Sequence, residues 1–485
     1  MSFLNPIFYL FIPIFLILYY LIPQRYRYIV IFVGSYFFYG YANIQMLAVL
    51  AAITLLTYIG GFIIEKKKNK IVLVTFFVLN IAVLFVFKYT NFIIKNINVL
   101  RGLIENTSTQ ISPVNLILPV GLSFIIFQSC TYLTDVYRDN VHAEYNIIKY
   151  ASFVAFFPTV LSGPIQKARD LLPQIARPAE FNAEQAKKGT IVFVWGLFEK
   201  IIVANKLQVI VNRVFSDYSN YNSAYYIIAA IAFSLYIYAD FSSYSDMARG
   251  ISMLMGIDVG KNFKNPYLSR STSEFWTRWH ASLNSWFVEN VYIPLGGNRH
   301  GKIRKYINVF IVFLLSGFWH GADYHFIAWG VVNGLFVIIG QILKPVKLMM
   351  YHKLRINENS SSIVFLKRVV VFVLITISWI FFNNGVRASF HIIKSMIFFQ
   401  PIRFFDSNLL TIAGTLNTTF VTIMSAIIFG VVQVKRQNET LQYKKYSAQP
   451  MVLQVIVLSL LICACMFGAC ATDTIANTQF LYFQF

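Results

Sequence analysis

Apolar residues along this chain come in long blocks separated by short polar loops. A helix needs about 20 apolar residues to cross the hydrocarbon core of a bilayer, and most of the blocks approach or exceed that length. The pattern predicts an all-α polytopic membrane protein with about 11 to 13 crossings. The blocks lie at 6–23, 28–42, 45–64, 71–88, 114–134, 190–211, 225–257, 306–343, 369–383, 418–434 and 451–471.

Three segments depart from a plain crossing. The segment 150–165 is short and contains Pro158 and Pro164, which is typical of a re-entrant or broken helix surrounded by protein. The blocks 225–257 and 306–343 are too long for one perpendicular helix. Each is therefore expected to be tilted, broken or a pair of short crossings.

Composition agrees with lipid as the solvent for much of the surface. Of the 485 residues, 57% are hydrophobic and 13% charged, and the mean hydropathy is +0.60, whereas about a quarter of the residues in soluble domains are charged. The net charge of +21 comes from Lys and Arg that flank the apolar blocks. This placement favours membrane lipid headgroups over nucleic acid as the partner, and leaves an anionic acyl donor open.

The basic residues also orient the chain. Lys and Arg in short loops favour the cytoplasmic side. The loop at Arg25 and Arg27 and the loop at Lys66 to Lys70 both lie inside if the N-terminus is external. The sequence thus predicts a multi-pass protein of the inner (cytoplasmic) membrane with an external N-terminus.

The polar segment 258–305 carries basic residues together with regularly spaced apolar ones. Trp276, Trp279 and Leu283 recur at three- and four-residue spacing, which predicts one amphipathic helix at the membrane interface, capped by a residue of 271–273. Because the chain has no low-complexity tract, linker or internal repeat, 1–485 is expected to form a single membrane domain.

His320 interrupts the apolar block 306–343. Ionisable residues at membrane depth are costly and are candidates for function, and an imidazole suits general base chemistry near neutral pH. Gly317 and Gly321 would let another helix or a ligand approach closely. Asp323, three residues further on, is near enough on a helix to orient His320. The alternative is a buried histidine that only bonds a neighbouring helix.

Three more ionisable residues lie at apolar positions. His280 lies on the apolar stripe of the interfacial helix, where packing among aromatic residues is an equal alternative to function. Asp240 and Asp246 interrupt the block 225–257, and in a straight helix they point about 120° apart. Each is expected to pair with a basic residue or a histidine elsewhere, for structure or for function. The four cysteines form no C-x-x-C pair, so no metal site is expected.

Several strings, in this order, resemble the membrane-bound O-acyltransferase (MBOAT) family, specifically its bacterial alginate O-acetyltransferase-like branch. The resemblance spans nearly the whole chain and is densest from 150 to 335. The strings are FFPTVLSGPIQ at 156–166, YADFSSYSDM at 238–247, NFKNPYLSRSTSEFWTRWHASLNSWFVENVYIPLGG at 262–297, FWHGA at 318–322 and FLYFQF at 480–485.

The resemblance implies an MBOAT fold and an acyl transfer from a donor on the cytoplasmic side to a hydroxyl presented from the other side, through a tunnel. The family's catalytic histidine falls on His320 and the second implicated histidine on His280. Trp319, Asn262 and Arg278 lie in the same strings and are expected to support them.

The resemblance also implies the other participants. The donor is an acyl thioester, either acetyl-CoA or an acyl-carrier type, and no tightly bound cofactor is expected. The expected acceptors are an exported glycan of the alginate kind and a secreted or membrane-anchored partner protein.

Some alternatives stay open. Ser243, where this branch usually has Gly, and the run Asp323 to His325 depart from the family pattern and leave the acyl group and the acceptor undecided. D-alanyl transfer to a teichoic acid is the alternative within the enzyme class. A transporter or lipid flippase is the alternative from another class, although such proteins commonly contain repeats. A non-catalytic scaffold would leave the two histidines unexplained.

Overall fold

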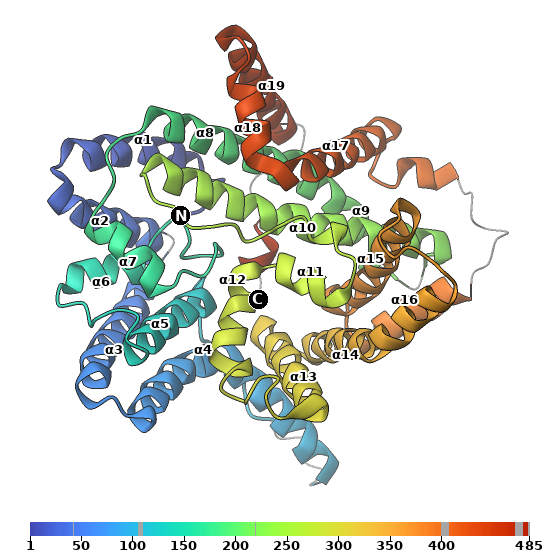
Figure 1. Cartoon of the computed structure of the whole chain (residues 1–485), viewed down its shortest axis with the longest axis horizontal. Helices are drawn as coiled ribbons and strands as arrows, with labels where there is room; N and C mark the ends of the chain where they lie inside the picture. The colour runs from blue at the N-terminus through green and yellow to red at the C-terminus, as the bar shows by residue number, and fades with distance from the viewer. Residues whose placement is uncertain (42, 105–109, 219, 399–406, 471–478, 484–485) are drawn as a thin grey trace. The chain divides into compact units, whose positions relative to one another are not determined.

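A computed structural model gives the fold, and it describes residues 1–41, 43–104, 110–218, 220–398, 407–470 and 479–483 (Figure 1). Over these residues the chain forms helices and turns and no strand, so the all-α prediction is confirmed. The chain divides into two compact units, Met1–Phe193 with Met247–Gly260 and Val194–Asp246 with Lys261–Phe485. That both units form one membrane domain stays a prediction.

The first unit is made of the N-terminal helices and the end of a long later helix. Its helices are α1 (Pro6–Leu21), η1 (Gln24–Tyr26), α2 (Arg27–Gly40), α3 (Gln45–Lys67), α4 (Lys70–Ile104), α5 (Leu122–Tyr137), α6 (Ile147–Val154), α7 (Ala168–Ala176) and the start of α8 (Ala183–Phe198).

The segment that was expected to be broken follows α6 in this unit. Every side chain from 151 to 166 is buried. The Phe157 N–H donates to Ser35 Oγ at 3.1 Å, and Thr131 Oγ1 donates to the Gln166 carbonyl at 3.0 Å. Backbone groups of this irregular stretch thus find partners inside protein, as they must at membrane depth. The prediction of a broken segment is confirmed.

The second unit contains the remaining helices. They are η2 (Glu199–Ala204), α9 (Asn205–Phe215), most of α10 (Ser223–Leu254), η3 (Pro266–Leu268), α11 (Thr272–Arg278), α12 (Ala281–Phe287), η4 (Val288–Tyr292), α13 (Gly301–His320), α14 (Tyr324–Lys353), α15 (Ser361–Asn383), α16 (Val386–Ile397), η6 (Ser407–Thr411), α17 (Leu416–Lys435), η7 (Arg436–Asn438), α18 (Glu439–Ser447), α19 (Met451–Cys470) and η8 (Leu481–Phe483).

The two apolar blocks that are too long for one perpendicular crossing fold differently. The block 225–257 forms one unbroken helix of 32 residues, α10. The block 306–343 breaks into α13 and α14, because Gly321 is extended and Asp323 starts a new helix by capping it. The block 114–134 is helical only from Leu122 onward.

Seven helical stretches among the described residues are long and apolar enough to cross a membrane. The other expected crossings fall on shorter helices such as α1, α2 and α5, which have 14 to 16 residues. The seven stretches are Gln45–Lys67, Lys70–Ile104, Ser223–Leu254, Tyr324–Lys353, Ser361–Asn383, Leu416–Ser447 and Met451–Gly468.

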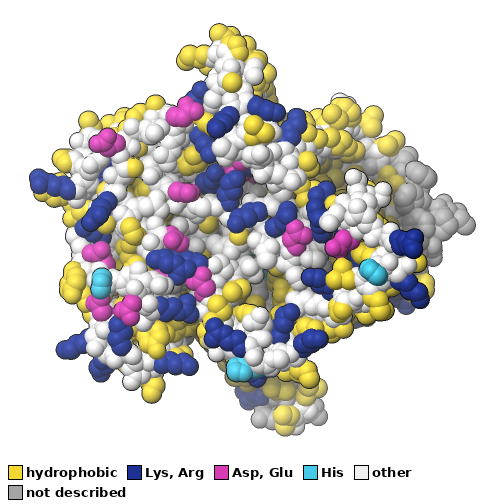
Figure 2. Space-filling model, in the orientation of Figure 1, with side chains coloured by type: hydrophobic (Ala, Val, Ile, Leu, Met, Phe, Trp, Pro, Cys, Tyr) yellow, Lys and Arg dark blue, Asp and Glu magenta, His cyan; other side chains and the backbone are white. Residues whose placement is uncertain are grey.

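The outer faces of these helices are apolar. In α19, Met451, Leu460 and Phe467 are 79%, 64% and 76% exposed, which water would not favour and hydrocarbon does. On the face drawn in Figure 2, dark-blue Lys and Arg side chains clearly outnumber magenta Asp and Glu side chains. Together these features describe a multi-pass membrane protein with a basic polar surface.

The predicted interfacial helix is wrong in one respect: it is two short helices. Ser271 caps α11 as expected, accepting a hydrogen bond from the Glu274 N–H at 3.1 Å. The helix then ends at Arg278, and α12 begins at Ala281. The break lies at His280, whose φ of 44° is left-handed and incompatible with a continuous helix.

Candidate active site

His320 is the last residue of α13, where the chain turns into α14. Three residues earlier, Gly317 packs on Gly330 of α14; a Cβ on Gly330 would come within 2.5 Å of the Phe313 carbonyl oxygen, and one on Gly317 would overlap the Phe326 carbonyl. A larger residue at either position would push the helices apart. This close approach fixes the position of His320. Of the two glycines expected on one helical face, only Gly317 lies within the helix, because Gly321 is extended.

The imidazole of His320 is 4% exposed and lies among aromatic rings. The ring centroids of Trp319, Trp329 and Phe382 lie 4.9, 5.0 and 5.1 Å away, all edge-on. Its place at the C-terminal end of α13 puts it near the negative end of the helix dipole, which favours positive charge. The aromatic surroundings exclude water, and the helix end offsets part of the cost that burial imposes on a protonated ring.

His280 is held in a left-handed conformation between α11 and α12. A non-glycine residue there costs about 1–2 kcal/mol, and such conformations are concentrated at functional sites. Asn262 supports it from the preceding loop. Asn262 Oδ1 lies 3.1 Å from His280 Nδ1 and accepts from Ser282 Oγ at 2.9 Å, and the Asn262 carbonyl accepts from the Ala281 N–H at 2.9 Å.

This support defines the charge and tautomer of His280. Because an amide oxygen only accepts, the contact with Asn262 Oδ1 places the proton of the neutral ring on Nδ1. The side chain is 2% exposed, and the Phe241 ring lies 4.6 Å away, edge-on. Burial lowers the pKa of His280 to about 3. His280 is therefore neutral at pH 7.

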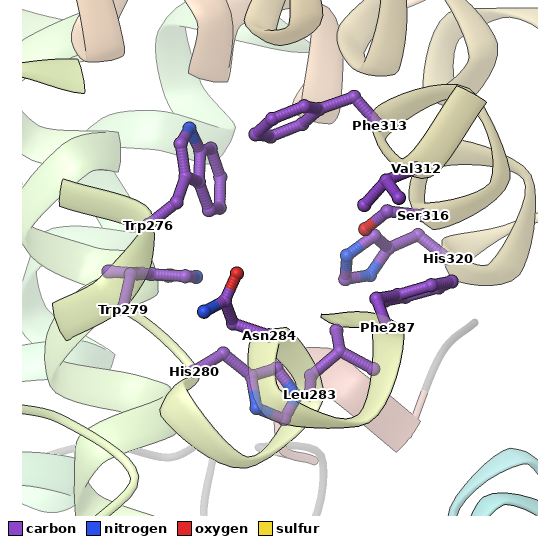
Figure 3. A pocket seen from close by; sticks show the side chains of 10 residues that line it. All are labelled: Trp276, Trp279, His280, Leu283, Asn284, Phe287, Val312, Phe313, Ser316 and His320. Atoms are coloured by element: carbon purple, nitrogen blue, oxygen red, sulfur yellow. The ribbon is translucent and has the colours of Figure 1, made fainter. Parts of the chain in front are cut away.

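Both histidines line one cavity of about 50 Å³ (Figure 3). A water needs at least about 10–15 Å³ of such volume, so the space suits a few small-molecule atoms. Most of the wall is aromatic or aliphatic, with Asn284 and Ser316 as further polar groups. The lining residues are Trp276, Trp279, His280, Leu283, Asn284, Phe287, Val312, Phe313, Ser316 and His320.

The Trp319 ring lies close to the rings of both His320 and His280. Its ring centroid lies 4.9 Å from that of His320 and 6.3 Å from that of His280. Trp319 is 6% exposed. Among the residues singled out in the sequence, the structure thus brings together His320, His280, Trp319 and Asn262.

The expectation for Asp323 is wrong. The residue does not follow His320 on one helix, because α13 ends at His320. Instead Asp323 caps α14, where its carboxylate accepts from the His325 N–H at 3.3 Å. His325 Nδ1 in turn lies 3.0 Å from the Phe381 carbonyl oxygen. Arg278 is also occupied elsewhere, in an ion pair with Glu274 one turn earlier on α11.

Asp240 and Asp246 lie outside the cavity lining, and each pairs with a basic residue. Asp240 Oδ1 lies 2.6 Å from Lys200 Nζ, and Asp240 Oδ2 accepts from the Leu481 N–H at 2.8 Å. Asp246 Oδ2 lies 2.6 Å from an Arg436 nitrogen, which is also 3.6 Å from Glu199. We call Glu199, Lys200, Asp240, Asp246 and Arg436 the ionic cluster.

Three residues of the ionic cluster and the cavity are not singled out by the sequence: Glu199, Lys200 and Asn284. Glu199 and Lys200 interrupt the apolar block 190–211, which is the same sequence signal that singles out His320. Asn284 had no comparable signal, because a polar residue on an amphipathic helix reads as part of its exposed face. Its position in the cavity lining depends on the break at His280, after which α12 begins.

Comparison with known proteins gives the family. Residues 31–386 match the model of the membrane-bound O-acyltransferase family, MBOAT. A "Probable alginate O-acetylase AlgI" of Pseudomonas syringae pv. tomato is 32% identical over 88% of this chain and 80% of its own length.

Two further relatives have other acceptors in their names. A "Peptidoglycan O-acetyltransferase" of Helicobacter pylori is 28% identical over 75% of this chain and 72% of its own length. A "Teichoic acid D-alanyltransferase" of Bacillus subtilis is 27% identical over 46% of this chain and 59% of its own length. The chain belongs to the membrane-bound O-acyltransferase family.

Proposed function

We propose that this acyltransferase moves an acetyl group from a thioester donor to a hydroxyl of an exported polysaccharide. The observation that carries the proposal is the cavity that His320 and His280 share. Its volume of about 50 Å³ suits an acetyl group better than a long acyl chain. Two relatives that cover three quarters or more of the chain are named for O-acetylation of alginate and of peptidoglycan.

In the proposed step, His320 acts as the general base. The acceptor O–H bond breaks and its proton goes to the His320 ring, while the oxygen bonds to the carbonyl carbon of the thioester. The carbon–sulfur bond then breaks, and the proton passes from His320 to the leaving thiolate. Because the walls around His320 are aromatic and buried, they exclude the water that would hydrolyse the thioester.

His280 has a different part in the proposal. A ring with a pKa of about 3 holds no proton at pH 7, so it acts as a fixed neutral dipole rather than as an acid. Its rigid mounting on Asn262 suits the positioning of a reactant.

The remaining participants belong to the same proposal. The donor is acetyl-CoA or an acetylated carrier on the cytoplasmic side of the inner membrane. Where a secreted or membrane-anchored partner protein supplies the acceptor hydroxyl in place of the glycan, it carries the acetyl group onward to the glycan. The N-terminus is external, as the basic loops favour.

The test is transfer of a radiolabelled acetyl group by purified protein in lipid nanodiscs, with His320→Ala compared with the wild type. Removal of a general base lowers the rate about 10²–10⁴-fold, so labelled product should nearly vanish. His352→Ala removes an exposed histidine near the end of α14 and should leave the rate unchanged. Full activity in the His320→Ala protein would contradict the proposal.

A donor comparison separates acetylation from D-alanylation. Acetyl and D-alanyl thioesters of the same carrier are supplied in parallel to the wild-type protein. We expect consumption of the acetyl thioester, since the D-alanyltransferase relative matches only 46% of the chain. Preferential use of the D-alanyl thioester would reverse the assignment of the acyl group.

A further inference from the structure

Trp279 and Asn284 lie on the α11–α12 side of the cavity and offer hydrogen bonds that the protein does not use. Figure 3 shows the indole nitrogen of Trp279 at the edge of the cavity, with the amide nitrogen of Asn284 directed toward it and the amide oxygen toward the open centre; His320 is on the opposite wall. Within the parts of the chain that the structure describes, neither side chain has a hydrogen-bond partner. Trp279 as a whole is 2% exposed, and Asn284 is partly exposed.

Two other asparagines of the second unit use their side-chain nitrogens as donors within the protein. Asn333 donates to the Trp329 carbonyl at 2.8 Å, and Asn290 donates to the Trp286 carbonyl at 2.9 Å. Most buried polar groups in proteins are paired in this way. The side chains of Trp279 and Asn284 border the cavity and have no such partner among the described residues, so a molecule bound in the cavity can accept from both.

We propose that Asn284 Nδ2–H and Trp279 Nε1–H bind the carbonyl oxygen of the acyl thioester. This inference rests on the proposed function. When the acceptor hydroxyl adds to the carbonyl carbon, the C=O π electrons move onto that oxygen, and the two donors stabilise the charge. When the C–S bond breaks, the carbonyl re-forms and the charge leaves with the thiolate.

The Trp279 ring and the backbone that carries Asn284 are held in place before any substrate binds. The Trp279 ring stacks on Phe275 at 5.6 Å between centroids and packs against Trp379 at 4.9 Å. The backbone N–H of Asn284 donates to the His280 carbonyl at 3.0 Å, so the left-handed turn at His280 sets the start of α12. Fixed donors need no rearrangement as charge develops, which is the condition for this form of catalysis.

The arrangement divides the chemistry between two walls. The α13 wall carries His320, which handles the proton of the acceptor hydroxyl. The α11–α12 wall carries the two donors, which handle the developing negative charge. The acyl carbonyl would lie between them, in the space that Figure 3 shows free of labelled side chains.

Two substitutions, each of which removes one donor, test the inference. Asn284→Asp replaces the amide donor by a carboxylate, and Trp279→Phe removes the indole N–H. Each should lower kcat about 10²–10³-fold, as expected for loss of one such donor, with KM for the acetyl thioester changed by no more than about threefold. Asn290→Asp and Trp286→Phe are matched controls outside the cavity lining and should keep the wild-type kcat.

The outcomes separate this inference from the proposed function. A wild-type kcat in both cavity variants, or a rise in KM alone, overturns the inference while the proposed function stands. If the wild-type protein consumes no acetyl thioester, both fail. Thermal unfolding in detergent identifies a variant that does not fold. In that case the other variant decides, since Trp279→Phe keeps most of the packing surface and Asn284→Asp keeps the shape.

Discussion

The cavity and the ionic cluster are both buried polar regions of the second unit, but their polar atoms are in opposite situations. In the ionic cluster, Asp240 and Lys200 are 1% and 0% exposed and lie 2.6 Å apart. In the cavity, Trp279 and Asn284 face an open space without a partner among the described residues. Full pairing indicates a structural role, and an unused donor indicates a place for substrate.

Both regions contain ionisable residues that interrupt apolar runs, and by that criterion alone they are alike. Asp240 and Asp246 looked as eligible for chemistry as His320 did. The contacts distinguish them, because Asp240 pairs with Lys200 and Asp246 pairs with Arg436. We therefore expect substitutions in the cluster to affect stability first and substitutions in the cavity to affect the rate.

The largest loss of stability is expected for Asp240→Ala, which tests whether the ionic cluster is structural. This variant leaves the buried Lys200 without its ion partner. Removing one partner of a buried pair costs about 3–5 kcal/mol, and here it also removes the acceptor of the Leu481 N–H. The thermal unfolding temperature in detergent should fall markedly. The double variant Asp240→Ala with Lys200→Met should recover part of the loss. Unchanged stability of the single variant would show that the cluster is not structural.

A second variant addresses the wall of the cavity. In Gly317→Ala the new Cβ would overlap the Phe326 backbone, which cannot move aside without shifting α14. We expect a loss toward the upper end of the roughly 1–3 kcal/mol for overpacking, measured by thermal unfolding. Acetyl transfer should fall as well, since His320 moves with α13. Gly430→Ala in α17 meets nothing within 4 Å and should be neutral or slightly stabilising.

A smaller effect is expected on the pH dependence of stability, through His280 in the cavity wall. The folded-state pKa of His280 is lowered from 6.5 to about 3, so below pH 6.5 the unfolded chain binds a proton that the folded chain does not. This contribution to stability is complete above pH 6.5 and is lost as the pH falls. Between pH 7 and pH 5 the loss is about 2 kcal/mol.

His280→Asn provides the control, because asparagine tolerates a left-handed backbone and does not titrate. Unfolding in detergent should depend less on pH in this variant than in the wild type over the same interval. An identical pH dependence would mean that folding does not lower the pKa of His280. The ring would then be partly protonated near pH 6.5, and its assignment as a permanently neutral dipole would fail.

The sequence predicts most of the helices because a lipid solvent leaves few alternatives for an apolar block. It predicts the importance of His320 for the same reason. It does not predict the breaks at Gly321 and His280, since these depend on packing and on the support that Asn262 provides from a separate loop. The error about Asp323 and the omission of Asn284 both follow from assuming that a helix continues where the structure interrupts it.

The left-handed backbone at His280 limits what evolution can place there. Residues that adopt this conformation at low cost are glycine, asparagine and aspartate, and histidine is also enriched in it. A β-branched or bulky residue would strain the turn even if its side chain filled the same volume. Across homologues we expect position 280 to vary within this small set. Drift at this position is then restricted by backbone geometry as well as by the imidazole.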